Sequence, residues 1–201
     1  MRIAFLVKNF ADGDEMSEYV KSLAEYAAKN GHDSFVVSFD DGSNYSVSEN
    51  VEVERFRLHF DGGSLYTWTM MMNNEMKGKV MEKIGEKEID VIHANDWTTA
   101  PGGVTLSKHL EKPLFLTFHS TENQRGFGGQ HSGLISELEW QGSFEADMVF
   151  ANNDDVKNSL LFDLDLPDEK ICVADPLHEG WQEKILNCYR EISDKEIEVK
   201  A

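Results

Sequence analysis

Two short stretches of this sequence place hydrogen-bonding and ionisable side chains directly after an apolar run. The first stretch is Val91–Trp97, which reads VIHANDW, and the second is Leu114–Glu122, which reads LFLTFHSTE. The side chains that could do chemistry at their ends are His93, Asn95, Asp96, His119, Ser120 and Glu122. Imidazole, carboxylate and hydroxyl groups can hydrogen-bond a polar substrate, exchange a proton with it or bind a metal ion.

The segment between these stretches predicts how the polar residues are positioned. Thr99 to Lys112 has the length and the pattern of a helix. Strand, helix and strand of this size form a unit that joins two parallel strands. In an open parallel sheet, ligands bind beyond the carboxyl ends of the strands. We therefore expect both polar clusters to face one crevice at that edge of the sheet.

The rest of the chain continues the alternation of strands and helices. Arg2–Val7 is a continuous apolar run, as expected of a central strand that is covered on both faces. The strand that begins at Val51 changes phase between Val53 and Phe56, which predicts a bulge, and Asn152 is expected to cap the next helix. We predict a single doubly wound, Rossmann-like α/β domain with about seven mostly parallel strands, helices on both faces and a closing C-terminal helix.

The amino-acid composition restricts the classes of molecule that this protein is expected to bind. The 37 acidic and 19 basic residues give a formal net charge of −18, which argues against nucleic acid and anionic membranes, because both require a positive surface. Met1 lies directly before a strand and no apolar run has spanning length, so we expect a soluble, cytoplasmic protein. Cys172 and Cys188 lack metal-ligand spacing and are expected to be free thiols, and no cofactor is expected.

Two motifs at the expected crevice resemble those of a known family. HANDWTTAP (residues 93–101) and TFHSTENQRGFGG (residues 117–129) are similar to H-x-H-D-W-x-T and T-x-H-S/N-x-E of GT-B glycosyltransferases of the glycogen and starch synthase type, and of related retaining glycosyltransferases. The resemblance covers most of residues 1–175 and concerns the N-terminal domain. It implies a domain that binds the acceptor glycan, while a second Rossmann-like domain binds the nucleotide sugar, usually without a metal.

The resemblance also implies roles for individual residues. Asp96 would lie on the acceptor side. His119 would lie against the transferred sugar as the catalytic candidate, offering its backbone carbonyl or a ring nitrogen. Glu122 and Arg125 would support the loop over the cleft, and Trp97 could stack on a sugar ring or wall the pocket. The remaining candidates for substrate contact are His93, Asn95 and Ser120.

The sequence departs from the family at the donor site. Counting back from LAEYAAKNGHD, the glycines of the donor-phosphate loop fall on Asp14 and Glu15, and Met16 takes the third position. Glycine lets a phosphate approach the backbone closely. A carboxylate instead repels it, by about 1 kcal/mol for one pair at ~4 Å even in water. We therefore expect a degenerate donor loop that does not bind a nucleotide sugar.

A second departure concerns the C-terminal part of the sequence. In the family, the nucleotide-sugar domain follows the position of Asp175-Pro176. Here the sequence continues with EGWQEKILNCYREI, which resembles the last helix of the full-length family, the one that returns to the N-terminal domain. We therefore expect an acceptor-side domain over residues 1–176, and a returning helix with a charged tail over residues 177–201.

Three functions follow from these patterns. The favoured hypothesis is an acceptor-side domain that is not catalytic alone and retains a crevice for a glycan. The second is one half of a split retaining glycosyltransferase, which transfers glucose from a nucleotide sugar to an α-glucan once another chain completes it. A protein partner or a homo-oligomer is compatible with both. The third is a metal-dependent hydrolase, although its residues could equally hydrogen-bond loop backbone. The metal-binding candidates are His93, Asp96, His119, Glu122 and His131.

Overall fold

The computed structural model describes residues 1–43, 45–59, 62–85, 87–126 and 128–200, the last six by their backbone alone. The strands are β1 (Arg2–Asn9), β2 (Asp33–Phe39), β3 (Val51–Phe56), β4 (Val91–Asn95), β5 (Leu114–Phe118), β6 (Met148–Ala151) and β7 (Ile171–Val173). The helices are α1 (Glu15–Lys29), α2 (Leu65–Ile84), α3 (Ala100–Leu110), α4 (Ser132–Glu145), α5 (Asp154–Phe162), the short 3-10 helix η1 (Asp168–Lys170) and α6 (Trp181–Lys200). Over the described residues, no helix combines the length and the apolar character that crossing a membrane requires.

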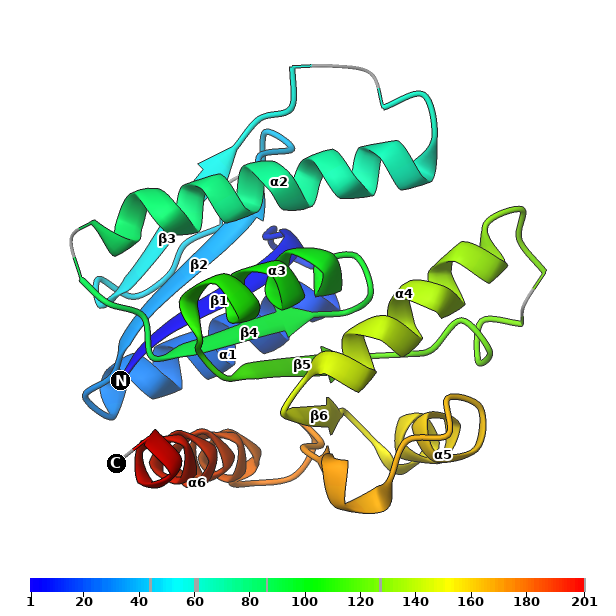
Figure 1. Cartoon of the computed structure of the whole chain (residues 1–201). Coiled ribbons are helices and arrows are strands. Elements are labelled where there is room, and N and C mark those ends of the chain that lie inside the picture. The colour runs from blue at the N-terminus through cyan, green and yellow to red at the C-terminus, as the bar shows by residue number, and fades with distance from the viewer. Residues whose placement is uncertain (44, 60–61, 86, 127, 201) are drawn as a thin grey trace.

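The strands form one sheet in the order β3-β2-β1-β4-β5-β6-β7 (Figure 1). Every pair of neighbouring strands is parallel, which confirms the predicted α/β fold. The chain builds outward from β1 to β3 on one side and from β4 to β7 on the other. The strand order therefore reverses between β1 and β4, and ligands of such sheets bind at this reversal, beyond the carboxyl ends of the strands.

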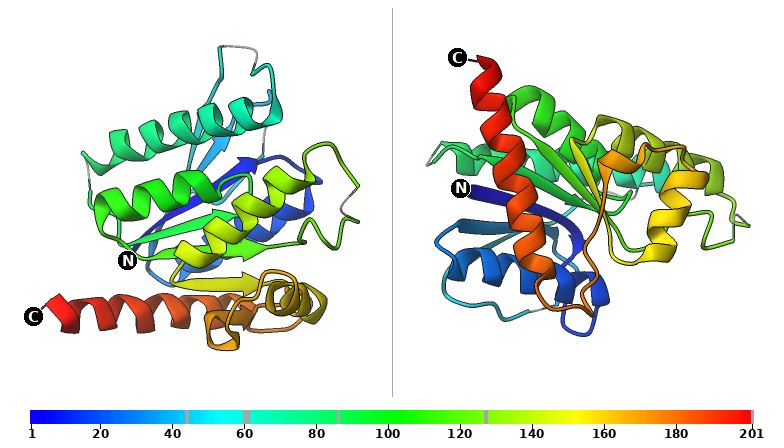
Figure 2. Two further views of the ribbon diagram at one scale, coloured as in Figure 1. Left: turned by 45° about the vertical axis from the view of Figure 1, so that its right-hand side comes forward. Right: turned by 90° about the horizontal axis from the view of Figure 1, so that it is seen from below.

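Each face of the sheet carries its own apolar core. Strand β1 shows why, because Ala4 and Leu6 face the core beneath α2 to α5, while Ile3, Phe5 and Val7 face the core beneath α1 and α6. Side chains of a strand alternate between the faces, so burial on both faces requires the continuous apolar run seen in the sequence. Figure 2 shows α1 and α6 on one side of the sheet and α2 to α4 on the other.

Helix α6 packs beside α1 and completes the second core. Its buried side chains are Trp181, Ile185, Leu186 and Tyr189. They pack in one cluster with Phe115 of β5 and Phe150 of β6. The hydroxyl of Tyr26 in α1 also donates a hydrogen bond of 2.7 Å to Glu183 in α6. This helix therefore covers apolar side chains of the sheet that would otherwise meet water.

The structure corrects two local expectations. Strand β3 pairs with β2 in unbroken register, so it contains no bulge. The change of phase arises because Val51 and Val53 pack against the core of α1, whereas Phe56 packs against the core of α2. Helix α5 is capped by Asn153, whose side chain accepts a hydrogen bond from a backbone N–H of the first turn, and not by Asn152.

Candidate functional site

The loops after β4 and β5 meet at the carboxyl edge of the sheet, beside the reversal of strand order. Asp96 and Trp97 follow β4, and the loop after β5 begins with His119. Pairing of the two strands aligns the loops, since the backbone N–H of Asp96 donates to the carbonyl of Thr117 at 2.8 Å. We define the carboxyl-edge cluster as the predicted site residues in these two loops. Its members are Asp96, Trp97, His119, Ser120, Glu122 and Arg125.

Asp96 has an unusual backbone conformation, with a φ of 63°. Residues other than glycine rarely adopt this left-handed region, which costs them about 1 kcal/mol. Asp96 is 8% exposed, and its Oδ1 accepts a hydrogen bond of 2.9 Å from the backbone N–H of Trp97. Burial raises the pKa of Asp96 to about 6, while this hydrogen bond and the charges of Arg125 and Lys8 oppose the rise. Strained residues of this kind cluster at functional sites.

The imidazole of His119 has an uncommitted nitrogen. Its Nδ1 lies 3.5 Å from Nδ2 of Asn152, whereas its Nε2 is buried and makes no hydrogen bond within the described part of the chain. Burial lowers the pKa of His119 to about 4, although the charge of Asp14 acts in the opposite direction. The ring is therefore neutral near pH 7. A buried polar atom without a partner is one that a bound hydroxyl group could satisfy.

An ionic network holds the loop after β5. Arg125 donates from Nε to Oε2 of Glu122 at 3.2 Å and from Nη2 to Oε1 of Glu139 at 2.7 Å. Its Nη1 donates to the Ser120 hydroxyl at 2.7 Å. Glu139 also accepts from the backbone N–H of Glu122, and the Ser132 hydroxyl donates to Glu122 at 2.6 Å. The network therefore fixes Ser120, Glu122 and Arg125 relative to one another.

Glu139 is the charged member of this network that the sequence did not indicate. It lies in α4 and is 1% exposed. Burial raises the pKa of Glu139 to about 7, while the backbone N–H of Glu122 and the charge of Arg125 partly oppose this. The available signal was a carboxylate between Leu138 and Trp140 in a helical pattern. This pattern indicates an ionic network only once the structure places the guanidinium of Arg125 beside the carboxylate.

His93 and Asn95 lie inside the protein, and both are 0% exposed. The two ring nitrogens of His93 are hydrogen-bonded to the hydroxyl of Tyr189 in α6 and, at 2.6 Å, to that of Thr117. Burial lowers the pKa of His93 to about 3. Nδ2 of Asn95 donates to the carbonyl of Leu6 at 3.1 Å. Both nitrogens of His93 are thus engaged within the protein, so the expected substrate contact of His93 would require one of these hydrogen bonds to break.

The expected donor loop forms the start of α1. Asp14 is the N-cap of this helix, and its Oδ2 accepts hydrogen bonds from the backbone N–H and the hydroxyl of Ser17, at 2.8 and 2.7 Å. Glu15 and Glu18 add two carboxylates to the first turn, and Met16 is half-buried. A helix N-terminus attracts anions through its free N–H groups and its dipole. Here the protein's own carboxylates occupy that position.

The hydrolase hypothesis finds no support at this edge. The described residues contain no group of three or more His, Cys, Asp and Glu side chains that could hold a metal ion. His93 is enclosed by its two hydroxyl partners, and His131 lies at the start of α4. The residues proposed as ligands therefore do not converge.

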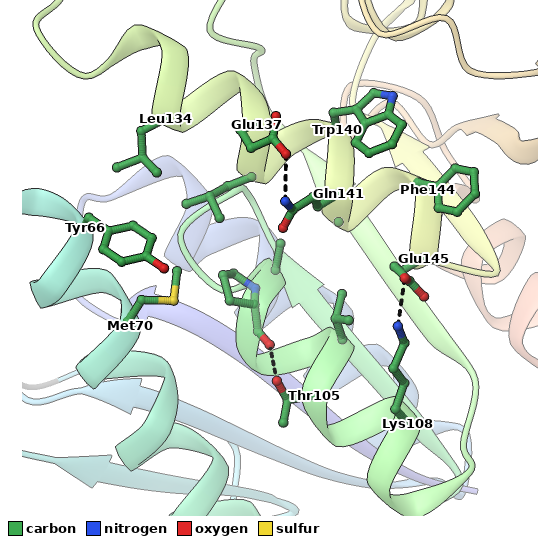
Figure 3. A pocket seen from close by; sticks show the side chains of 15 residues that line it. Tyr66, Met70, Thr105, Lys108, Leu134, Glu137, Trp140, Gln141, Phe144 and Glu145 are labelled. Carbon is green, nitrogen blue, oxygen red and sulfur yellow. Dashed lines mark hydrogen bonds and ion pairs between the residues drawn. The ribbon is translucent and has the colours of Figure 1, made fainter.

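Of the hollows on the described surface, two that lie outside the carboxyl-edge cluster border α4 and α6. The larger, of about 510 Å³, lies between α2, α3 and α4 (Figure 3). Tyr66 and Met70 of α2 line one side, Trp140 of α4 lines the other, and the Lys108–Glu145 ion pair of 2.7 Å is part of its lining. A smaller hollow of about 360 Å³ lies where β7 leads into α6. No residue of the cluster lines either one.

Comparison with known sequences places the chain among glycosyltransferases. The sequence profile of Glycosyltransferase Family 4 matches residues 16–176. An uncharacterized glycosyltransferase of Methanocaldococcus jannaschii, MJ1607, is 30% identical over 182 residues, which cover 83% of this chain and 45% of that protein. The chain thus spans about half the length of this curated relative.

Solved structures share the fold at low sequence identity. Sucrose-phosphate synthase from Thermosynechococcus elongatus matches with a TM-score of 0.71 and 13% identity, over 87% of this chain and 47% of that chain. A second structure of this synthase, designated by residues 27–220 and 406–426, matches with a TM-score of 0.68 and 16% identity, over 96% and 99% of the two chains. HepE of Anabaena, in complex with UDP and glucose, matches with a TM-score of 0.59 and 19% identity, over 87% and 44%. With a family match over most of its length, the chain belongs to Glycosyltransferase Family 4, as an N-terminal domain of the GT-B type.

Proposed function

We propose that this chain is the acceptor-side domain of a family 4 glycosyltransferase, which binds a glycan at the carboxyl-edge cluster and does not transfer sugar by itself. One contrast carries the proposal. Among the described residues, Nε2 of His119 has no hydrogen-bond partner and the Asp96 carboxylate accepts one hydrogen bond, from the backbone N–H of Trp97, whereas the N-terminus of α1 is already occupied by Asp14. The first pair of side chains suits a neutral polyol, and the second position disfavours a diphosphate.

The acceptor side rests on the chemistry of Asp96 and His119. A carboxyl group accepts hydrogen bonds from sugar hydroxyls, and a neutral imidazole can either donate or accept one. Trp97 is half-buried beside Asp96 and provides an aromatic face on which a sugar ring can stack. A neutral ligand is also not repelled by a protein with a net charge of −18. The motifs at residues 93–101 and 117–129 make an α-glucan the first candidate ligand.

The donor side argues against binding of a nucleotide sugar by this chain alone. Asp14 accepts the hydrogen bond that a phosphate would otherwise receive from the backbone N–H of Ser17. A diphosphate would also face Glu15 and Glu18, and each like-charge pair at ~4 Å costs about 1 kcal/mol even in bulk water. A catalytic cycle would therefore need a donor site outside residues 1–201, and in the split-enzyme form of the proposal another chain supplies it.

We further propose that residues 177–201 form the returning helix of the full-length family. The buried face of α6 supports this, because it packs on the same core as α1. The sucrose-phosphate synthase structure designated 27–220 and 406–426 supports it as well, since this chain matches it over nearly its full length. Residues 1–176 would then be the acceptor-side domain proper. A partner chain with a nucleotide-sugar domain, or a second copy, would dock against the carboxyl edge.

Calorimetric titration tests the proposed function. We expect maltotetraose to bind with a stoichiometry of one, and UDP-glucose to give no heat of binding. Asp96→Ala should weaken glucan binding at least tenfold, because hydrogen bonds to a charged group contribute about 1.5–3 kcal/mol. Asp165→Ala is the matched control, since Asp165 is an exposed aspartate in the same left-handed region, with a φ of 52°. Binding of UDP-glucose would overturn the donor-side argument, and failure of every glucan would overturn the acceptor side.

A further inference from the structure

The two cysteines of the chain lie side by side, on different elements. Cys172 is in β7 and Cys188 is in α6, sixteen positions later. Their sulfur atoms are 4.0 Å apart, which allows a weak hydrogen bond from the Cys188 thiol to Cys172 Sγ. Both residues are free thiols and half-buried, so small reagents can reach them. Neither belongs to the carboxyl-edge cluster.

The surroundings make the two thiols unequal. The hydrogen bond from Cys188 lowers the pKa of Cys172 to about 7, with a further contribution from the charge of Lys184, while burial opposes the shift. Lys184 is held nearby, because its Nζ donates to the carbonyl of Val173 at 2.7 Å. The pKa of Cys188 is raised by its contact with Cys172 and by burial. Near neutral pH, Cys172 therefore ionises more readily than Cys188.

We propose that Cys172 and Cys188 form a thiol–disulfide site, which reacts with low-molecular-weight disulfides to link β7 to α6. A disulfide requires sulfur atoms about 2.05 Å apart, so the two sulfurs must approach by about 2 Å. Strand β7 can accommodate this movement, since it has three residues, lies at the edge of the sheet and pairs only with β6.

The reaction needs two exchanges with the small disulfide, RSSR. The Cys172 thiolate attacks one sulfur of RSSR, the S–S bond breaks, and RS⁻ leaves and takes up a proton. Cys188 then loses its proton to solvent and attacks Cys172 Sγ, which forms the protein disulfide and releases the second RS⁻. In total, two protein thiols and one RSSR give one protein disulfide and two RSH. The protein is oxidised by two electrons and RSSR is reduced.

The link would fix the start of α6 on the sheet. The closed loop contains Asp175, Pro176 and the first turns of α6, including Trp181. Closing a loop of this length restricts the unfolded chain, so the oxidised protein should melt roughly 6–12 °C higher than the reduced one. The same link would keep Trp181 in contact with Tyr19, on which it stacks with 4.5 Å between ring centroids.

The test is oxidation of the reduced full chain with oxidised glutathione at pH 7.5, followed by mass spectrometry and thermal unfolding. We expect a monomer that is lighter by two hydrogen atoms, contains no titratable thiol and has a raised Tm. Dithiothreitol should restore the original mass and Tm. Cys188→Ser should stop at a single glutathione adduct on Cys172, and Cys172→Ser should likewise form no internal disulfide, because each variant lacks the second thiol.

Three outcomes would overturn the proposal. The first is a stable product with two glutathione adducts, which would show that the sulfurs cannot meet. The second is a disulfide-linked dimer on a non-reducing gel as the main product. The third is an internal disulfide with an unchanged or lowered Tm, which would show that the link does not hold α6 on the native sheet.

Discussion

The ring of Tyr19 lies edge-on against the imidazole of His119, with 4.8 Å between ring centroids and planes 87° apart. The same tyrosine ring stacks on Trp181 of α6 at 4.5 Å. A helix from the end of the sequence therefore backs the histidine that is the catalytic candidate. Helix α6 therefore covers the core and also, through Trp181, supports the Tyr19 ring that contacts His119.

Replacing Trp181 tests the contribution of α6 to stability. Trp181 is 6% exposed, so Trp181→Ala removes a large buried aromatic and should lower the free energy of unfolding by about 3–5 kcal/mol. Urea denaturation followed by circular dichroism measures the change. Leu177→Ala is the control, since this nearby side chain is 91% exposed and its loss should change stability by less than ~0.5 kcal/mol. Equal, small effects of the two substitutions would contradict the packing of α6.

The Arg125 network predicts a loss of stability that depends on pH. Arg125→Ala leaves the buried carboxyls of Glu122 and Glu139 without their cation, which should cost about 3 kcal/mol at pH 8. The cost should be smaller at pH 5. Without Arg125, the pKa of Glu139 in the folded protein rises further above its value in the unfolded chain. At pH 5 the folded variant therefore keeps Glu139 protonated and neutral, whereas the unfolded chain releases this proton. Denaturation at both pH values measures this.

A matched ion pair supplies the control for that experiment. Lys79 pairs with Glu82 at 2.7 Å on the surface of α2. Lys79→Ala should therefore change the free energy of unfolding far less than Arg125→Ala at either pH. If Arg125→Ala is no worse than Lys79→Ala, the loop after β5 is not held by this network.

The buried imidazole of His93 predicts a second dependence on pH. Its pKa falls from 6.5 to about 3 on folding, because burial disfavours the charged ring. Between these values the unfolded chain binds a proton that the folded chain does not, so stability is lost as pH falls below 6.5. His93→Gln removes this contribution. The difference in unfolding free energy, wild type minus variant, should fall by about 1 kcal/mol from pH 6 to pH 5 and stay constant above pH 7.5. A flat difference would mean that folding does not change the pKa of His93.

Two substitutions of Asp96 separate its role in glucan binding from the effect of its backbone conformation on stability. Glycine adopts a positive φ without penalty, whereas alanine does not, so Asp96→Gly should be about 1 kcal/mol more stable than Asp96→Ala. Both variants should lose glucan binding, because both lack the carboxyl group. Thermal unfolding gives the first comparison and calorimetry the second. A glycine variant that still binds the glucan would remove Asp96 from the proposed site.

The parts of the fold that follow from local pattern were predictable. The apolar runs that begin at Val91 and Leu114 were expected to be adjacent parallel strands, and the structure has them as β4 and β5. The change of phase after Val53 was misread as a bulge. In an edge strand covered by different helices at its two ends, the same pattern arises without any irregularity.

The parts of the site that depend on distant contacts were not predictable. The ring of His93 is enclosed by Tyr189, which is 96 positions away, and no local pattern reports that contact. Glu139 gains its role from Arg125, fourteen positions earlier and on a separate element. By contrast, the positions of Asp96 and His119 followed from strand order alone, because neighbouring parallel strands end at the same edge.

The most direct test of glycan binding at the carboxyl edge is a map of backbone amide shifts in ¹⁵N-labelled protein titrated with maltotetraose. We expect shifts at Asp96, at Trp97 and along residues 119–125, and none at Trp140 in the hollow between α2, α3 and α4. UDP-glucose at the same concentration should leave the amides of Asp14 and Glu15 unchanged. Shifts confined to the surroundings of Trp140, or a spectrum that maltotetraose and longer glucans leave unchanged, would contradict binding at this edge.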